Sequence, residues 1–288
     1  MTAREIQKIG VIGSGAMGSQ IAMVAALAGY RVALQDVVPE SLEKAKTTLQ
    51  GHMDNRVKKG RLTKEQVDAA FSNLSFEQDL EAALADADFV IEAVVEKLDV
   101  KRDVFAALDR VAPAHAILAT NSSTIVSSKV ADATQRPDKV CNMHFFNPAL
   151  VMQLVEVVRN ESTSQDTVDT AVELARKMGK VPITLQKEIS GFVANRILAA
   201  LMDEAVNLYE QGIASFEDID VAVTKGLNHP IGPFALMDLT GIDVNYLVRM
   251  QRYQESGDEK DKPKASVAKK YEQGELGRKT GKGWYSYE

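Results

Sequence analysis

A histidine and a glutamate that could move a proton together lie on neighbouring strand-like segments. His144 is in Val140–Phe145 and Glu156 is in Gln153–Val158, with Asn147–Met152 between them. In an antiparallel pair the numbers of opposite residues add to a constant, so a hairpin centred within that connection would set His144 against Glu156. A carboxylate beside an imidazole fixes its tautomer and favours its protonated form, which suits a general acid–base. A structural ion pair is the competing interpretation.

A second group of residues matches a phosphate-binding turn. Residues Gly13–Gly18 (GSGAMG) fit the pattern G-x-G-x-x-G between a strand-like and a helix-like segment. The first glycine permits a tight turn, the second admits a pyrophosphate, and the third lets the helix pack on the strand, while the helix start supplies N–H donors. Glycines that merely make a turn are the alternative. The expected cofactor contacts are Gly13, Gly15, Ala16, Met17 and Gly18.

Asp36 closes the second strand-like segment, about 20 residues beyond this turn, where an acidic side chain can accept a hydrogen bond from the 2′-hydroxyl of an adenosine ribose. Its charge would repel a 2′-phosphate, so the sequence favours NAD over NADP. The alternative is an ordinary turn residue ahead of Pro39.

Alternating strand-like and helix-like segments must position these side chains. Apolar, β-branched runs and amphipathic stretches alternate up to about Leu185, which predicts a parallel α/β sheet. The expected strands are Lys8–Gly13, Arg31–Asp36, Phe89–Val94, Ala116–Thr120, Val140–Phe145, Gln153–Val158 and Lys180–Leu185. Beyond Gly191 the run Phe192–Tyr209 is apolar nearly all round, as in a buried helix. We therefore predict a Rossmann-type doubly wound domain over residues 1–187 and a mostly α-helical C-terminal domain over 188–288.

Three further motifs make the chain recognisable. His144–Pro148 (HFFNP), Leu154–Val157 (LVEV) and Gly191–Arg196 (GFVANR) resemble the (S)-3-hydroxyacyl-CoA dehydrogenase family. The resemblance runs from the glycine turn to Gly277–Tyr287, and the chain length is similar to that of the family's short, single-function form. It implies reversible NAD-dependent oxidation of an (S)-3-hydroxyacyl-CoA, expected to be the short-chain 3-hydroxybutyryl-CoA, to the 3-oxoacyl-CoA, acetoacetyl-CoA.

The resemblance also implies roles for single residues. His144 matches the acid–base and Glu156 its partner, while Ser123 and Asn195 match residues that bind and orient the substrate oxygen. Family members usually read Asn-Thr-Ser-Ser where this chain reads Asn-Ser-Ser-Thr, so we align Ser123 with the family serine and regard Ser122 as its neighbour. Without the resemblance, this run could simply cap the next helix.

Further cofactor contacts come from the resemblance alone. Taken by themselves, Glu96 and Lys101 would belong to a solvated helix face. The implied contacts are Glu96, Lys101, Asn121, Ser123, Asn147 and Lys279.

A basic run, Asn55–Arg61, lies on the helix expected after the second strand. In the resembled family this region contacts the nucleotide portion of coenzyme A, and Lys59 matches a lysine there, so we expect it to bind substrate. A solvated helix end is the alternative. A nucleic-acid site is disfavoured because the run lacks interleaved aromatic residues and the chain carries a net charge of −6.

The overall composition limits the remaining possibilities. Cys141, the single cysteine, cannot form an intrachain disulfide, so we expect a buried thiol and a reducing, cytoplasmic setting. The four histidines show no metal-ligand spacing, and no apolar run is long enough for a membrane span. We expect no metal, nucleic-acid or membrane partner, and a homodimer. Rival functions are a dehydrogenase of free hydroxy or sugar acids, and a non-catalytic NAD-binding protein.

Overall fold

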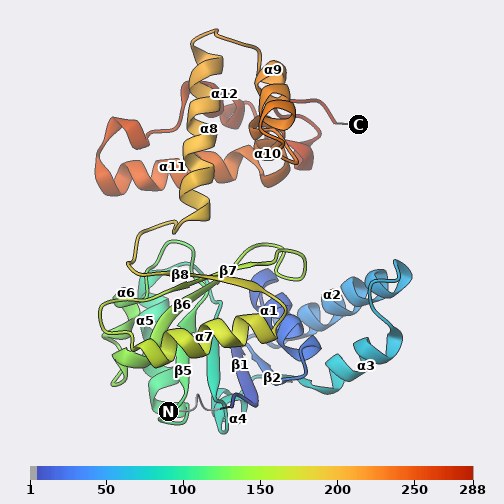
Figure 1. Cartoon of the computed structure of the whole chain (residues 1–288), viewed down its shortest axis with the longest axis vertical. Helices are drawn as coiled ribbons and strands as arrows, with labels where there is room; N and C mark the ends of the chain where they lie inside the picture. Colours follow the sequence, from blue (N-terminus) through green and yellow to red (C-terminus); the bar gives the residue numbers. More distant parts are fainter. Residues whose placement is uncertain (1–4, 288) are drawn as a thin grey trace. The chain divides into compact units, whose positions relative to one another are not determined.

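The computed structural model describes residues 5–287. The chain forms two compact units, and the division between them falls between Phe192 and Val193 (Figure 1). This division lies a few residues after the boundary expected from the sequence. Contacts of the connecting segment explain the difference, because the Gly191 N–H donates to the Ser123 carbonyl and the Phe192 ring packs on the His144 ring. The segment up to Phe192 therefore belongs to the first unit.

The first unit is built on one eight-stranded sheet in the order β3-β2-β1-β4-β5-β6-β7-β8. Every neighbouring pair is parallel except β6 and β7, which are antiparallel. The strand order reverses at β1 and β4, the point where doubly wound sheets bind ligands. The strands are β1 (Lys8–Ile12), β2 (Arg31–Gln35), β3 (Leu74–Glu77), β4 (Phe89–Glu92), β5 (Ile117–Thr120), β6 (Val140–Phe145), β7 (Leu154–Val158) and β8 (Val181–Leu185).

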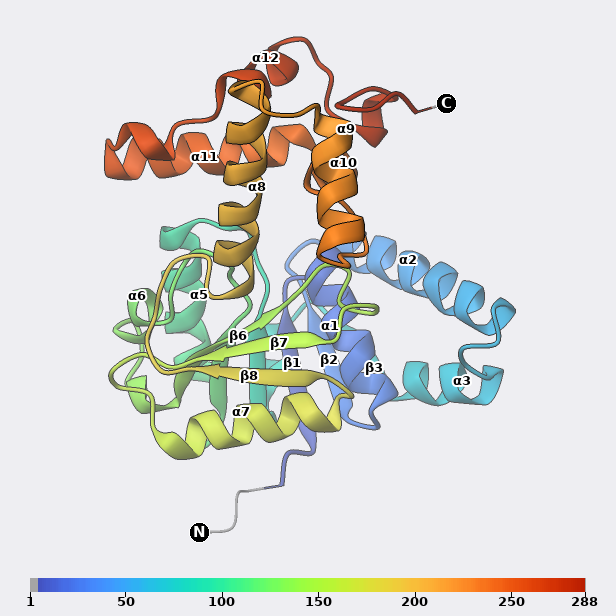
Figure 2. The same ribbon diagram turned by 45° about the horizontal axis from the view of Figure 1, so that its top comes forward.

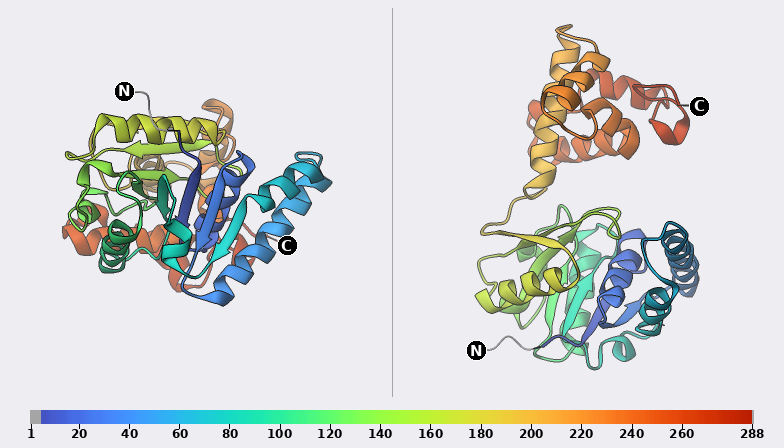
Figure 3. Two further views of the ribbon diagram at one scale, coloured as in Figure 1. Left: turned by 90° about the horizontal axis from the view of Figure 1, so that it is seen from below. Right: turned by 45° about the vertical axis from the view of Figure 1, so that its right-hand side comes forward.

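Helices cover both faces of this sheet, as Figures 2 and 3 show. One face shares a hydrophobic cluster with α1 (Ala16–Leu27), α2 (Pro39–Lys58), α3 (Lys64–Ser72) and α7 (Gln165–Lys177). The other packs against α4 (Leu80–Leu84), α5 (Leu98–Val111) and α6 (Ser128–Ala131), and a short 3₁₀ turn, η1 (Pro137–Lys139), precedes β6. The predicted Rossmann-type, doubly wound architecture is confirmed.

One strand, β3, was not expected from the sequence. It is a four-residue strand at the end of the sheet, and only its first residue, Leu74, is buried. Such a short edge strand lacks the apolar run or strict alternation by which strands are recognised.

The second unit is helical, and its single hydrophobic cluster includes Met202, Phe234, Met237 and Trp284. Two buried carboxylates organise it: Asp220 accepts from the backbone N–H groups of Phe234 and Ala235, and Asp238 from those of Trp284 and Tyr285. The helices are α8 (Ala194–Glu210), α9 (Phe216–Val221), α10 (Pro233–Thr240), α11 (Ile242–Ser256) and α12 (Ala265–Glu272), with shorter turns η2 (Ala222–Gly226), η3 (Glu259–Asp261) and η4 (Arg278–Thr280). Among residues 5–287, no helix combines the length and apolar character needed to cross a membrane.

Candidate active site

The site is centred on the antiparallel pair of β6 and β7, where His144 lies directly opposite Glu156. Opposite residues of such a pair project from the same face of the sheet. The Nδ1 atom of His144 is 2.9 Å from Oε2 of Glu156, and both side chains are buried, at 3% and 0% exposure. The register predicted from the residue numbers is thus the observed one.

The second ring nitrogen of His144 contacts a hydroxyl group. Nε2 lies 2.9 Å from Oγ of Ser123, which follows the end of β5. Because a carboxylate can only accept, Nδ1 carries the hydrogen toward Glu156, and Nε2 of the neutral ring is left to accept the Ser123 hydroxyl hydrogen. This tautomer directs the basic nitrogen toward the hydroxyl group.

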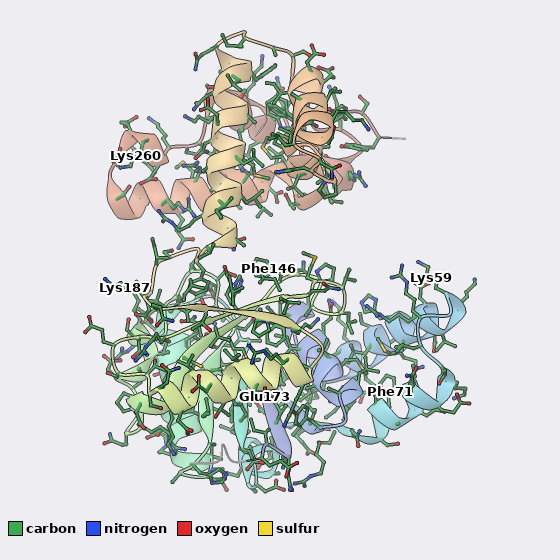
Figure 4. The ribbon with its side chains drawn as sticks, in the orientation of Figure 1. Lys59, Phe71, Phe146, Glu173, Lys187 and Lys260 are labelled. Atoms are coloured by element: carbon green, nitrogen blue, oxygen red, sulfur yellow. The ribbon has the colours of Figure 1, made fainter. Side chains whose placement is uncertain are left out.

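Two aromatic rings enclose the imidazole. The ring of Phe146, just after β6 (Figure 4), lies 4.6 Å from the His144 ring, and that of Phe192 lies 5.3 Å away. Phe192 has a positive φ of 49°, a strained conformation for a bulky residue that is concentrated at functional sites. The sequence predicts Phe192 at the start of an apolar helical run, whereas α8 begins at Ala194 and the Phe192 ring packs on that of His144. The sequence pattern did not indicate this contact, because the two residues are far apart in the chain.

The two adjacent serines contact different groups. Ser123 faces His144, whereas the Ser122 hydroxyl donates to Oε1 of Glu96, which also accepts from the Thr124 hydroxyl at 2.8 Å. Burial alone would raise the pKa of the Glu96 carboxyl, but the Ser122 hydrogen bond and the nearby charge of Lys101 lower the pKa below its ordinary value. The Glu96 carboxylate is thereby held as a hydrogen-bond acceptor for the hydroxyl groups of Ser122 and Thr124.

Lys101 is not on a solvated face, the alternative weighed for it from the sequence. Its side chain is 1% exposed, and its Nζ atom lies 2.7 Å from Oε1 of the fully buried Glu92 and 3.3 Å from Oε2 of Glu96. Glu92 also accepts from the Thr120 hydroxyl at 2.7 Å. Glu92 was not predicted from the sequence as a site residue. Its buried pair with Lys101 connects the ends of β4 and β5 to α5.

The glycine turn has the form that a dinucleotide pyrophosphate needs. A Cβ on Gly13, at a φ of +98°, would lie 2.7 Å from the Ala93 carbonyl oxygen, and one on Gly18 would lie 1.9 Å from the Gly13 oxygen. Apart from its chain neighbours and the backbone of its own helix, no atom of residues 5–287 lies within 4 Å of the Cβ position of Gly15, so the backbone there is open to a ligand. Helix α1 starts without a side-chain cap or an acidic residue in its first turn, which leaves its positive end to an anion. The turn therefore fits NAD.

Asp36 makes the contacts of a turn residue, and its contact with a ribose hydroxyl stays a prediction. Its Oδ2 atom accepts from the Ser14 N–H and hydroxyl at 2.8 and 2.7 Å, and Oδ1 accepts from the Val38 N–H at 3.0 Å. The carboxylate is half-buried at the end of β2 and tied to the glycine turn. It places negative charge beside the glycine turn.

The other candidates occupy varied environments. Asn121 is buried and accepts from the Phe145 N–H at 2.9 Å, whereas Asn147 is exposed beyond β6 and precedes a cis proline. Asn195, in the first turn of α8, and Lys279 both belong to the second unit. Lys279 forms an ion pair with Asp243 at 2.5 Å, and its hydrogen bond lowers the pKa of the Asp243 carboxyl.

The basic run divides into two roles. Arg56 donates through Nη2 to the Leu150 carbonyl, in the connection between β6 and β7. Lys58, Lys59 and Arg61 are exposed, and Lys59 lies at the end of α2 away from the sheet (Figure 4). Three cations therefore remain accessible to an anionic ligand.

Cys141 is fully buried in β6, as expected, and burial raises the pKa of its thiol to about 12. Such a thiol is unreactive near neutral pH. Within the described part of the chain, no three His, Cys, Asp or Glu side chains are grouped so that they could hold a metal ion.

Both units match models of known families. The first match, over residues 8–189, is described as "3-hydroxyacyl-CoA dehydrogenase, NAD binding domain", and the second, over residues 191–287, as "3-hydroxyacyl-CoA dehydrogenase, C-terminal domain". A 3-hydroxybutyryl-CoA dehydrogenase of Clostridioides difficile is 42% identical, with 97% of this chain and 99% of that protein covered. A probable 3-hydroxybutyryl-CoA dehydrogenase of Bacillus subtilis is 40% identical, with 99% and 98% covered. Among solved structures, (S)-3-hydroxybutyryl-CoA dehydrogenase from Ralstonia eutropha is 37% identical and superposes with a TM-score of 0.91 over 99% of this chain and 100% of that one.

Proposed function

This chain belongs to the 3-hydroxyacyl-CoA dehydrogenase family, and on that premise we propose that its substrate is the short-chain (S)-3-hydroxybutyryl-CoA, oxidised reversibly to acetoacetyl-CoA. The chain is an NAD-dependent oxidoreductase with an NAD-binding domain. The observation that carries the proposed chemistry is the imidazole of His144, held between Glu156 on one nitrogen and Ser123 on the other.

In the oxidative direction, Nε2 of His144 takes the proton of the substrate 3-hydroxyl group as its C–O bond becomes a carbonyl. The Glu156 carboxylate, 2.9 Å from Nδ1, stabilises the imidazolium that results. Ser123 then donates its hydroxyl hydrogen to the substrate oxygen instead of to Nε2. In the reductive direction the imidazolium returns the proton. Asn195 is proposed to orient the same oxygen, following the family resemblance.

The glycine turn and the end of β2 would hold the cofactor, through Gly13, Gly15, Ala16, Met17, Gly18 and Asp36. When bound, NAD supplies the acceptor for the hydride that leaves C3. We assign Glu96, Lys101, Asn121, Asn147 and Lys279 to the same role. Since Lys101 is buried against Glu92, its proposed contribution is to hold Glu96 in place.

The coenzyme A portion is assigned to the exposed end of α2. Lys59, with Lys58 and Arg61 beside it, offers positive charge to phosphate groups on a protein of net charge −6. Arg56 is excluded from this group, because its guanidinium is used on the Leu150 carbonyl. Each phosphate contact on this exposed surface is expected to weaken with added salt.

Assembly and compartment are further parts of the proposal. The helical unit exposes large apolar side chains, among them Leu227, Leu239, Val244 and Leu247, each 49–62% exposed. Large exposed apolar side chains are frequent at subunit interfaces, and with the family resemblance they support a homodimer. The absence of any cysteine partner for Cys141 in the chain supports a reducing, cytoplasmic setting.

One absorbance assay tests the function. Purified protein should consume NADH in the presence of acetoacetyl-CoA, and should do so much more slowly with NADPH because Asp36 opposes a 2′-phosphate. Turnover of free acetoacetate at the same rate would favour the hydroxy-acid dehydrogenase, and absence of turnover with every substrate would favour a non-catalytic NAD-binding protein.

A further inference from the structure

A buried amide, Asn142, lies two residues before His144 on β6 and carries no role in the proposed chemistry. It is 0% exposed and pairs in register with Thr120 at the end of β5. Because side chains alternate along a strand, Asn142 and His144 project from the same face of the sheet, opposite to the apolar Cys141 and Met143. The amide therefore points toward the loop that follows β5.

All three hydrogen bonds of the amide go to the backbone of that loop. Its Oδ1 atom accepts from the Ser127 N–H at 2.7 Å, and its Nδ2 atom donates to the carbonyls of Ile125 and Ser122 at 3.2 and 3.4 Å. These three contacts bracket Ser123. Residues 121–127 form no helix or strand, so several of their backbone groups bond to side chains. Two backbone contacts also hold this loop, because the Asn121 N–H donates to the Glu92 carbonyl and the Ser123 carbonyl accepts from the Gly191 N–H.

The far end of the loop is held separately. The Ser127 hydroxyl donates to Glu188 at 2.9 Å and accepts from the Asn160 amide at 3.0 Å, and the Ser128 N–H donates to Glu188 at 2.8 Å.

Among the described contacts from β6 to this loop, those of Asn142 reach the backbone of the Ser122–Ser127 segment. The other two, from His144 and the Phe145 N–H, reach the side chains of Ser123 and Asn121. A strand is rigid over two residues, so the bonds of Asn142 set the loop at a fixed distance from the imidazole.

We propose that Asn142 is a positioning residue, which holds the Ser122–Ser127 loop so that the Ser123 hydroxyl meets Nε2 of His144. This inference rests on the proposed function, because it assigns the geometry of its Ser123–His144 contact. It excludes a direct role for Asn142 in binding substrate. It also predicts that loss of the amide acts through Ser123 and not through general instability.

A double-mutant cycle tests the proposal with the full chain. Asn142→Ala should lower kcat for acetoacetyl-CoA reduction by on the order of 10- to 100-fold, as expected for misplacement of a catalytic group. Ser123→Ala should lower kcat on its own, and the double variant should be no slower than Ser123→Ala, because Asn142 then has nothing left to position. Multiplied losses in the double variant, or wild-type kcat in Asn142→Ala, would overturn the proposal.

Two further variants separate positioning from folding. Asn142→Asp keeps the shape of the side chain and the Ser127 contact but cannot donate to the two carbonyls. If Asn142→Ala gives no folded protein, Asn142→Asp replaces it in the double-mutant cycle. The matched control is Thr167→Val, which removes a buried hydroxyl bonded to the Asp138 carbonyl at 2.8 Å, just before β6 and with no described contact to the loop. Thr167→Val should keep wild-type kcat although its melting temperature falls.

A spectroscopic readout makes the inference independent of turnover. In protein labelled with ¹⁵N-histidine, the His144 ring signals are identified by their absence in His144→Gln. Asn142→Ala should shift the Nε2 resonance in the same direction as Ser123→Ala, and an unshifted Nε2 resonance would refute the positioning role. If wild-type protein showed no turnover, the proposed function would fail, whereas this measurement would still decide whether Asn142 sets the Ser123–His144 contact.

Discussion

Glu156 lies directly across the β6–β7 pair from His144, and its Oε2 atom is 2.9 Å from the Nδ1 atom of the imidazole, with both side chains buried. The relationship depends on main-chain pairing, because the strand register places the two residues opposite each other. Because a carboxylate can only accept, Nδ1 carries its hydrogen toward Glu156, and Nε2 is directed to the Ser123 hydroxyl.

Glu156→Gln should preserve the fold and lower the turnover number, because the neutral amide stabilises the imidazolium less than a carboxylate does. We expect a loss of about 10²-fold, within the range of general acid–base effects. Wild-type turnover in a folded Glu156→Gln protein, measured by NADH formation from the hydroxyacyl-CoA, would count against this pairing.

Substitution of Ser122 and substitution of Ser123 should change different kinetic constants. Ser123→Ala removes the hydroxyl at Nε2 and should reduce kcat for acetoacetyl-CoA, whereas Ser122→Ala removes the hydrogen bond to Glu96 and should mainly raise KM for NADH. Steady-state kinetics with each substrate varied in turn distinguishes the two effects. The reverse assignment would follow if Ser122→Ala, and not Ser123→Ala, carried the loss of kcat.

Lys101→Met should destabilise the first unit, because it leaves the carboxylate of Glu92 buried without its cation. Loss of one partner of a buried pair costs about 3–5 kcal/mol, measurable by urea unfolding. Adding Glu92→Gln should recover part of this loss, because the neutral amide oxygen can still accept from Thr120. Lys97→Met, at an exposed position nearby, is the control and should change stability by about 0.5 kcal/mol or less.

Lys59→Ala should raise KM for acetoacetyl-CoA and spare KM for NADH, because the exposed cation is assigned to the coenzyme A phosphates. The wild-type KM for acetoacetyl-CoA should rise with salt, since exposed charges are screened over about 8 Å at physiological ionic strength.

A truncated thioester without the nucleotide provides the control for Lys59. It should be a poorer substrate and respond little to Lys59→Ala, because the contact that the lysine makes is missing from it. Equal losses with both substrates would instead show that the substitution acts through the fold, and the basic run would then be a solvated helix end.

The amino-acid sequence by itself determined those features whose causes are local or periodic. The strand, glycine turn and helix of residues 8–27 are adjacent in the chain, so their pattern is complete within one short window. The opposition of His144 and Glu156 was also predictable, because a short connection and the two-residue period of strands leave few registers that bury the apolar side chains.

The family resemblance selected Ser123 over Ser122, but only the tertiary structure shows that Ser123 contacts His144 and that Lys101 pairs with Glu92. Ser122 and Ser123 have the same chemistry, and their directions depend on Glu96 and Asn142, which belong to other segments of the chain. In the sequence, Lys101 has the pattern of a charged residue on an exposed helix face. Its buried position follows from its ion pair with Glu92, which lies at the end of β4. The contact between two side chains from distant parts of the sequence depends on how their helices and strands pack. The residues next to each side chain in the sequence do not predict that packing.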